Sequence, residues 1–232
     1  MRAGWLMLAA VAACAPRVAA TRAARPTATA GATATASAPS PVGVDAAYDR
    51  MQCLHLVQTR ARTVEAPLRA GKLTADEAAA LDDKWRADLA GIQELLDACS
   101  SRERSLLAER AGAWSADDAR AAAASLDALA TVAWALGYAS ALPPLDRPVD
   151  PAPLRQPAAG EPRLRDPAVL ASERDAATRA LRAAGSDDER ARLRERLRAL
   201  EWLGGAGSDW DALPVEPGYR MNSAPTPMLK AP

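Results

Sequence analysis

Apolar residues recur three and four positions apart through most of the chain from residue 44 to residue 203, and no stretch alternates apolar with polar side chains. That spacing is typical of amphipathic helices, because a strand requires a two-residue period. Phenylalanine is absent, so leucine, alanine and tryptophan must build the interior. The sequence therefore predicts an all-α fold, a single bundle-like domain of about six helices over residues 44–213.

Short polar signals mark where these helices begin. Ser or Thr followed three residues later by an acidic residue forms a capping box, and this pattern occurs at Thr74, Ser100, Ser115 and Ser186. Asp166 before a proline is a further helix start. We expect helices over residues 45–70 (kinked or ended early by Pro67 and stopped by Gly71), 74–96, 100–110, 115–138, 166–184 and 186–200.

The fourth predicted helix is the most apolar, since no charged residue occurs from Ala128 to Leu142. A membrane-spanning helix needs roughly 20 apolar residues, which is more than this run supplies. Arg120 and Asp127 also lie just before the run. The pattern favours a central core helix.

The N-terminus carries one basic residue, Arg2, and then a short apolar run that ends at Val11-Ala12-Ala13-Cys14. This ending resembles the lipobox of bacterial lipoproteins. The resemblance implies a signal peptide over residues 1–13 and palmitate-type acylation of Cys14. The residue after Cys14 is alanine and not aspartate. The resemblance therefore also implies a membrane protein held by lipid in the outer membrane and facing the periplasm. Two alternatives stay open: cleavage after Ala20 to give a soluble secreted protein, and a Cys14 that is an incidental small residue in an alanine-rich leader.

Residues 14–43 consist mostly of Ala, Thr, Pro and Ser, and such a composition cannot bury enough surface to offset the entropy of ordering it. We expect a lipidated flexible tether there and an irregular or disordered tail over residues 214–232. The 29 basic and 29 acidic residues cancel. This balance predicts no nucleic-acid partner. The expected partners are the membrane, through the N-terminal lipid, and a protein of the envelope.

Cys53 and Cys99 are the only cysteines besides Cys14. In an oxidising compartment an even pair suggests a disulfide. In a straight antiparallel hairpin that turns near Gly71, however, the two would be offset by about 10 Å along the helix axes, and a disulfide needs Cα atoms within about 7 Å. A disulfide and two buried free thiols both stay open.

Two ordered segments resemble an uncharacterised bacterial family, the domain family of unknown function numbered forty-two seventy-two. The first runs through Ser125-Leu126-Asp127-Ala128-Leu129, Trp134-Ala135-Leu136-Gly137 and Leu142-Pro143-Pro144. The second is Arg198-Ala199-Leu200-Glu201-Trp202-Leu203 followed by Asp209-Trp210-Asp211. Alanine precedes Ser125 where the family has arginine, and Asp127 stands where glutamate is usual. The resemblance implies an all-helical fold over residues 44–213 and no known activity.

No catalytic constellation is visible, and we predict no metal and no cofactor. The single histidine, His55, lacks partners at zinc-ligand spacing and is interpreted as a helix-face residue. The adjacent carboxylates at 82–83, 117–118 and 187–188 are interpreted as caps and solvated faces. The arginines between residues 190 and 198 are interpreted as a self-neutralised surface, with Glu195 at salt-bridge spacing from Arg198.

Trp85, Trp134 and Trp202 fall on apolar stripes and are predicted core residues. The candidates for a groove or polar site are Trp114, Asp127, Asp209 and Trp210.

The sequence is compatible with two hypotheses about function. A non-enzymatic interaction or scaffold module should show a shallow apolar patch. An enzyme that uses carboxylates and arginines, for example on glycans, should show a pocket with convergent carboxylates of perturbed pKa.

Overall fold

The computed structural model describes residues 42–150 and 161–213, and every regular element within them is a helix. In chain order the elements are α2 (Val44–Arg60), the π-helix η1 (Ala61–Glu65), α3 (Ala66–Arg69), α4 (Ala75–Ala90), α5 (Gln93–Ala98), α6 (Ser101–Ala108), α7 (Ala116–Ala135), α8 (Pro167–Ala183) and α9 (Asp187–Leu203). The all-α prediction is confirmed for these residues. The predicted signal peptide, the tail and nearly all of the predicted tether lie outside them.

The predicted capping signals do begin helices. At Thr74, Ser100 and Ser115 the hydroxyl accepts a hydrogen bond from the amide three residues later, and the acidic side chain there accepts one from the cap amide. The Ser186 hydroxyl accepts from the amide three residues on, at 3.2 Å, and the Asp166 carboxylate accepts from the amide two residues on, at 2.7 Å. These bonds satisfy amides that the first turn of a helix leaves unpaired.

The first predicted helix runs without a break through α2, η1 and α3 to Arg69, so Pro67 does not end it early. Pro67 has no N–H, and its ring crowds the carbonyl four residues earlier. The π-helical turn η1 ends two residues before Pro67 and widens the backbone there. The predicted stop at Gly71 is confirmed, since this residue has φ of 66° and the next amide, of Lys72, donates to the Pro67 carbonyl at 2.8 Å.

The second predicted helix is divided into α4 and α5, at a break that the sequence did not predict. Ile92 leaves helical geometry with φ of −128° and ψ of 37°, directly after Gly91. Glycine is a weak helix former, so the chain turns there at little cost. The turn ends α4 and directs the short helix α5 against α2.

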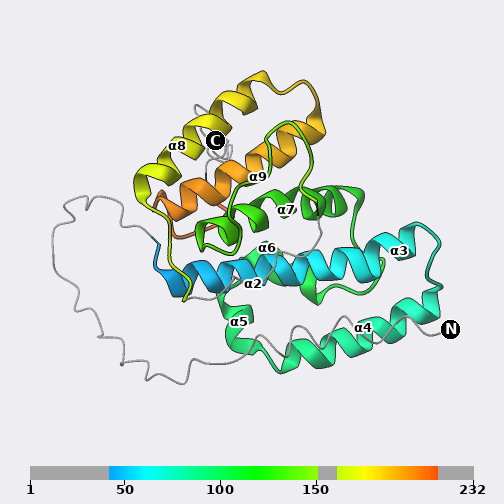
Figure 1. The fold of residues 1–232 in the computed structure, drawn as a ribbon. Helices are drawn as coiled ribbons and strands as arrows, with labels where there is room; N and C mark the ends of the chain where they lie inside the picture. Colours follow the sequence, from blue (N-terminus) through cyan, green and yellow to red (C-terminus); the bar gives the residue numbers. More distant parts are fainter. Residues whose placement is uncertain (1–41, 151–160, 214–232) are drawn as a thin grey trace, which may run out of the picture. The chain divides into compact units, whose positions relative to one another are not determined.

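Helix α7 lies at the centre of the packing, between α2 and α9, and α8 covers the other side of α9 (Figure 1). The inner positions of α7 include Ala128, Val132 and Ala135, all fully buried. Small side chains allow the neighbouring helices to approach closely. The expected core helix is thus confirmed, as is burial of the three core tryptophans. In the described part of the chain, no helix is apolar over a length that would cross a bilayer.

Candidate functional site

Cys53 of α2 and Cys99, just after α5, form a disulfide with Cα atoms 5.4 Å apart. Both residues are buried. The offset expected for a straight hairpin does not arise, because the break at residues 91–92 brings α5 back against α2. Of the two states left open by the sequence, the structure therefore has the bonded one.

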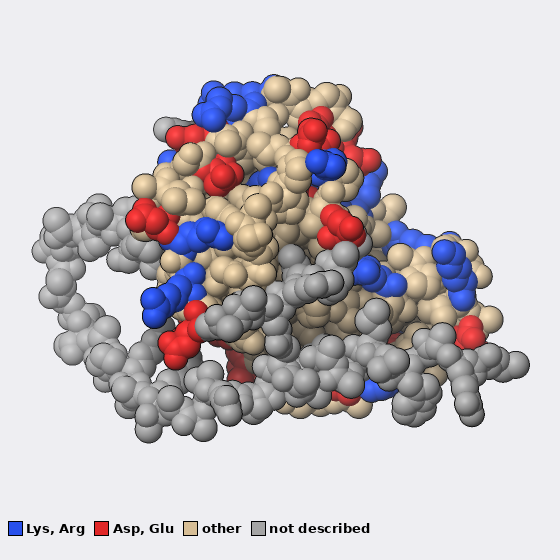
Figure 2. Space-filling model, in the orientation of Figure 1, with Lys and Arg blue, Asp and Glu red and all other residues tan. Residues whose placement is uncertain are grey.

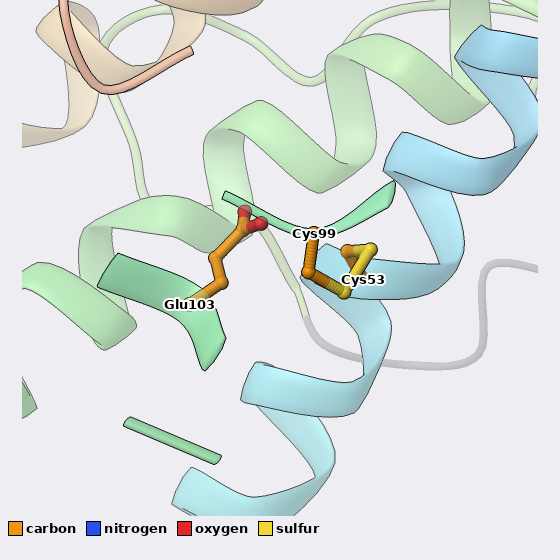
Figure 3. Close-up of side chains that lie close together, drawn as sticks. All are labelled: Cys53, Cys99 and Glu103. Carbon is orange, nitrogen blue, oxygen red and sulfur yellow. A yellow bond between two sulfur atoms is a disulfide. The ribbon is translucent and has the colours of Figure 1, made fainter. Parts of the chain in front are cut away.

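Glu103 of α6 lies beside this disulfide, as Figure 3 shows. One carboxylate oxygen and the two sulfurs lie within 4.8 Å of one another, a spacing that would suit a metal ion. Zinc, however, binds thiolates, and both sulfurs are consumed in the bond. The Arg50 guanidinium is also ion-paired with the Glu103 carboxylate. In the oxidised protein this group is a structural crosslink next to an ion pair.

The four candidate groove residues have separate partners. Trp114 is buried, and its indole N–H donates to the Leu106 carbonyl at 3.0 Å. Asp127 is buried in an ion pair. Asp209 is exposed and accepts a hydrogen bond from the amide two residues on. Of these four, Trp210 lines a hollow beside α6 and α9.

Asp127 and Arg196 form a buried ion pair between α7 and α9, with nitrogen and oxygen 3.2 Å apart. Arg196 also donates to the Pro143 carbonyl at 2.8 Å. Burial raises the pKa of the Asp127 carboxyl, and the arginine only partly offsets this. The interpretation of the α9 arginines as a surface face is therefore wrong for Arg196, which is 1% exposed. The pair joins two core helices, and Asp127 is 2% exposed.

A second buried cluster corrects the interpretation of the carboxylate pair at 82–83. Asp82 of α4 is buried, and its carboxylate lies 3.1 Å from the guanidinium of Arg60, which is fully buried. Glu65 lies 3.5 Å from the same guanidinium. Burial raises the pKa of the Glu65 carboxyl. Because buried charges require partners, this cluster holds α4 to the end of α2.

A third group of charged residues lies near the molecular surface, where α2, α6, α9 and the chain after α9 meet. The Arg50 guanidinium lies 4.8 Å from the ring centre of Trp210 and 5.6 Å from that of Trp202. Asp211 accepts a hydrogen bond from the Ser101 hydroxyl at 2.9 Å and from the Arg102 amide at 3.0 Å. Its carboxylate thus binds the positive N-terminus of α6. The segment after α9 is fixed by these contacts.

Two adjoining hollows open at this meeting point, and we call them together the α6–α9 site. The inner cavity has a volume of about 40 Å³, and the outer hollow has about 430 Å³. Both are bordered by Arg102, Arg198 and Asp211. The inner cavity is also lined by two further carboxylates, Glu103 and Glu195, and by mostly apolar residues. These residues are Leu54, Val57, Ser100, Leu106, Ala121, Ala122, Ser125 and Trp210. Ser101 and Ser105 complete the outer hollow.

Two carboxylates of the α6–α9 site have pKa values shifted in opposite directions. Burial raises the pKa of Glu195, although its side chain is bonded to Arg198. Burial also acts to raise the pKa of Asp211, but the hydrogen bonds from the Arg102 amide and the serine hydroxyl outweigh it, so the net shift is downward. The Glu195–Arg198 pairing confirms the predicted salt-bridge spacing. Sequence reasoning named Asp209 as the candidate here, whereas the neighbouring Asp211 borders the site.

Outside this site the described surface offers little for an apolar partner. Val169 is the single large hydrophobic residue exposed among residues 42–150 and 161–213. On the face shown in Figure 2, basic and acidic side chains are interspersed and form no block of one sign. His55 is exposed on α2 and borders neither hollow. The other large apolar side chains of these residues are buried or partly buried.

Comparison with known proteins gives one match. The model of a family of domains of unknown function, DUF4272, matches residues 40–213. Neither the curated proteins nor the solved structures include a significant match. The matched range contains every described helix and the whole α6–α9 site.

Proposed function

The chain belongs to the DUF4272 family, and we propose that its helical domain is a non-enzymatic binding module held at the bacterial cell envelope by lipid on Cys14. In this proposal residues 1–13 are removed as a signal peptide and residues 14–43 tether the domain. The domain faces the periplasm from the outer membrane and binds another envelope component. Three acyl chains on one cysteine hold a protein firmly, because each buried methylene contributes about 0.8 kcal/mol.

The disulfide between Cys53 and Cys99 is the observation that carries the proposal. Disulfides form and persist in oxidising compartments such as the periplasm, and they are rare in the cytosol. The leader sequence ending at Cys14 points independently to export. Two separate parts of the chain therefore favour the same side of the membrane.

Binding is favoured over catalysis because the carboxylates of the α6–α9 site already have structural partners. Glu103 is paired with Arg50, and Glu195 is bonded to Arg198. Asp211 holds the start of α6. The outer hollow has the volume of an ordinary small-ligand site.

One observation favours an enzyme instead. Two carboxylates with oppositely shifted pKa values, Glu195 raised and Asp211 lowered, border one cavity, and glycoside hydrolases use such pairs as acid and base. The test is the release of reducing ends from purified cell-wall and outer-membrane glycans. Hydrolysis that Glu195→Gln abolishes would replace the binding proposal with the enzyme. No release by the wild type would leave the binding module.

The proposed location, anchored by lipid in the outer membrane, is tested by labelling cells with a fatty-acid analogue and separating inner from outer membranes. We expect label on the wild-type protein in the outer-membrane fraction and no label on Cys14→Ala. Ala20→Arg is the matched control, because it blocks ordinary cleavage after residue 20 and leaves the lipobox intact. If Cys14→Ala is labelled like the wild type, or if Ala20→Arg abolishes maturation, the lipid anchor is wrong.

A further inference from the structure

Cys53, Cys99 and Glu103 bring two sulfur atoms and a carboxylate together inside the domain, where α2, the end of α5 and the start of α6 meet (Figure 3). All three residues are buried. The Glu103 Oε2 atom accepts hydrogen bonds from Arg50 and from the Ser100 amide, whereas Oε1 is buried without a hydrogen-bond partner among the described residues. A buried carboxylate oxygen without a partner is unfavourable, because it has lost its hydration and gained no bond in return. A cation bound between the three side chains would supply that partner.

The two sulfurs can bind a metal ion only after the bond between them is reduced. A dithiol reductant gives up two electrons and two protons, so that Cys53 and Cys99 become thiols and the dithiol becomes a disulfide. Zinc binds thiolates, so its binding releases the two protons again. Rotation about the Cα–Cβ bonds separates the sulfurs, and the Cα atoms, 5.4 Å apart in the oxidised protein, need no large shift.

The spacing of the candidate ligand atoms suits tetrahedral zinc. Zn–S bonds of about 2.3 Å and Zn–O bonds of about 2.0–2.2 Å place tetrahedral ligand atoms about 3.4–3.8 Å apart. The two sulfurs and the Glu103 carboxylate oxygen lie within 4.8 Å of one another. The Leu95 carbonyl oxygen lies 3.6 Å from the Cys53 sulfur and 3.4 Å from the Cys99 sulfur, which is the spacing that a fourth ligand requires. Four candidate ligand atoms therefore gather in the protein interior.

Two arginines border this group of atoms and favour its charged form. Zinc bound to two thiolates and one carboxylate carries one net negative charge. The Arg50 guanidinium is ion-paired with Glu103 and donates to the Ala98 carbonyl at 3.3 Å, and Arg104 donates to the Cys99 carbonyl at 2.8 Å. Nearby positive charge favours thiolates over thiols. The hydrogen bond from Arg50 also orients the carboxylate, as outer-shell partners do in metal sites.

We propose that reduction converts this crosslink into a zinc site, in which Cys53, Cys99 and Glu103 bind one Zn²⁺ and Arg50 orients the carboxylate. The ion replaces the covalent bond and keeps α2 joined to the start of α6 while the cysteines are reduced. Because the three side chains are buried, the ion is taken up as the reduced chain folds. This site goes beyond the proposed function and needs neither the lipid anchor nor a bound envelope component.

The test uses the full-length chain, unfolded in urea with a phosphine reductant and refolded with or without Zn²⁺. A phosphine, which is oxidised to the phosphine oxide, is chosen because a dithiol would bind zinc through its own thiolates. Unbound metal is removed by gel filtration, and the retained zinc is measured by atomic emission. We expect one zinc per reduced wild-type chain and none per oxidised chain. Zinc should also raise the urea midpoint of the reduced protein and leave that of the oxidised protein unchanged.

Cobalt(II) in place of zinc reports the ligands directly, because it accepts the same tetrahedral sulfur and oxygen ligands and absorbs visible light. Refolding the reduced wild type with Co²⁺ should give a thiolate-to-metal charge-transfer band in the near ultraviolet and the intense visible bands of a tetrahedral complex. This measurement needs no variant, so it does not depend on how well a variant folds.

Four variants identify the ligands. Cys53→Ser and Cys99→Ser should each lose the retained zinc and the charge-transfer band, whereas Cys14→Ser, which removes the one cysteine outside the site, should keep both. Glu103→Gln removes a charged ligand, so a competing chelator should take zinc from it at a concentration at least about ten-fold lower than from the wild type. Its matched control is Glu77→Gln, because Glu77 has the same place in the capping box of α4 that Glu103 has in α6.

The zinc site is overturned if the reduced wild type refolds and retains no zinc, or if its cobalt complex lacks the thiolate band. It is also overturned if either cysteine variant of the site retains zinc like Cys14→Ser, or if Glu103→Gln holds zinc as tightly as Glu77→Gln. None of these results bears on the proposed membrane location, because labelling of Cys14→Ala tests the location separately. A protein that takes up zinc but is found outside the outer membrane would overturn the location and leave the zinc site.

Discussion

Removing the disulfide should destabilise the helical domain by a predictable amount. The bond joins residues 46 apart in sequence. For a loop of that length, the loss of unfolded-state entropy corresponds to about 4 kcal/mol at room temperature in the chain-entropy description. In a domain of this size each kcal/mol shifts Tm by about 2–4 °C. The double variant Cys53→Ala, Cys99→Ala should therefore melt about 8–16 °C below the wild type.

The assay is urea unfolding followed by helical circular dichroism, with and without reductant present throughout. Without reductant, the wild type should be the more stable by about 4 kcal/mol. With reductant and refolding from urea, it should approach the double variant, whose own stability should not respond to reductant. Equal stabilities of the two oxidised proteins within about 1 kcal/mol would refute the reasoning, because the covalent constraint would then contribute almost nothing to the folded domain.

Three further predictions concern single side chains. Asp127→Ala leaves the Arg196 charge unpaired in the core and should lower the free energy of unfolding, measured with urea, by about 3–5 kcal/mol. Adding Arg196→Met to the same chain should restore part of that stability, and no restoration would argue against the buried pair. Ser115→Ala removes a capping box and should cost about 1 kcal/mol, measured the same way, and an unchanged midpoint would contradict the cap. The hydrogen bonds that Asp211 accepts from α6 lower its pKa. The ionised carboxylate therefore stabilises the fold at every pH above the ordinary pKa of 3.8, and this stabilisation is lost as the pH falls through the lower pKa of the folded state. Asp211→Asn should be less stable than the wild type near neutral pH, by about 1 kcal/mol given its exposure, and equally stable in strong acid; a gap that widens on acidification would refute the assignment.

Helix starts could be predicted from the sequence because they depend on local hydrogen bonds. Thr74, Ser100 and Ser115 each bond to residues within the next turn, so a short window of sequence contains all the partners. The same holds for the stop at Gly71, which needs only a residue that tolerates positive φ. The burial of α7 was likewise predicted, because no charged residue occurs from Ala128 to Leu142 and an uncharged run can be buried on every side.

Contacts between distant segments could not be predicted in this way. Arg196 stands in a run of arginines and glutamates, and nothing in that run shows that its partner is Asp127, 69 positions away. The disulfide stayed open because a straight helix was expected through Gly91 and Ile92, whereas the chain turns there. The α6–α9 site was missed for the same reason: Glu103 and Asp211 look like a cap and a loop residue until the fold brings them to one cavity.

The most direct measurement of the central claim is the intact mass of the protein extracted from native membranes without reductant. The account predicts a chain that begins at Cys14, carries acyl groups and is two hydrogens lighter than the sum of its residues, because Cys53 and Cys99 are joined. A chain that retains Met1, a chain that begins beyond residue 14, or a mature chain with two free thiols would contradict it.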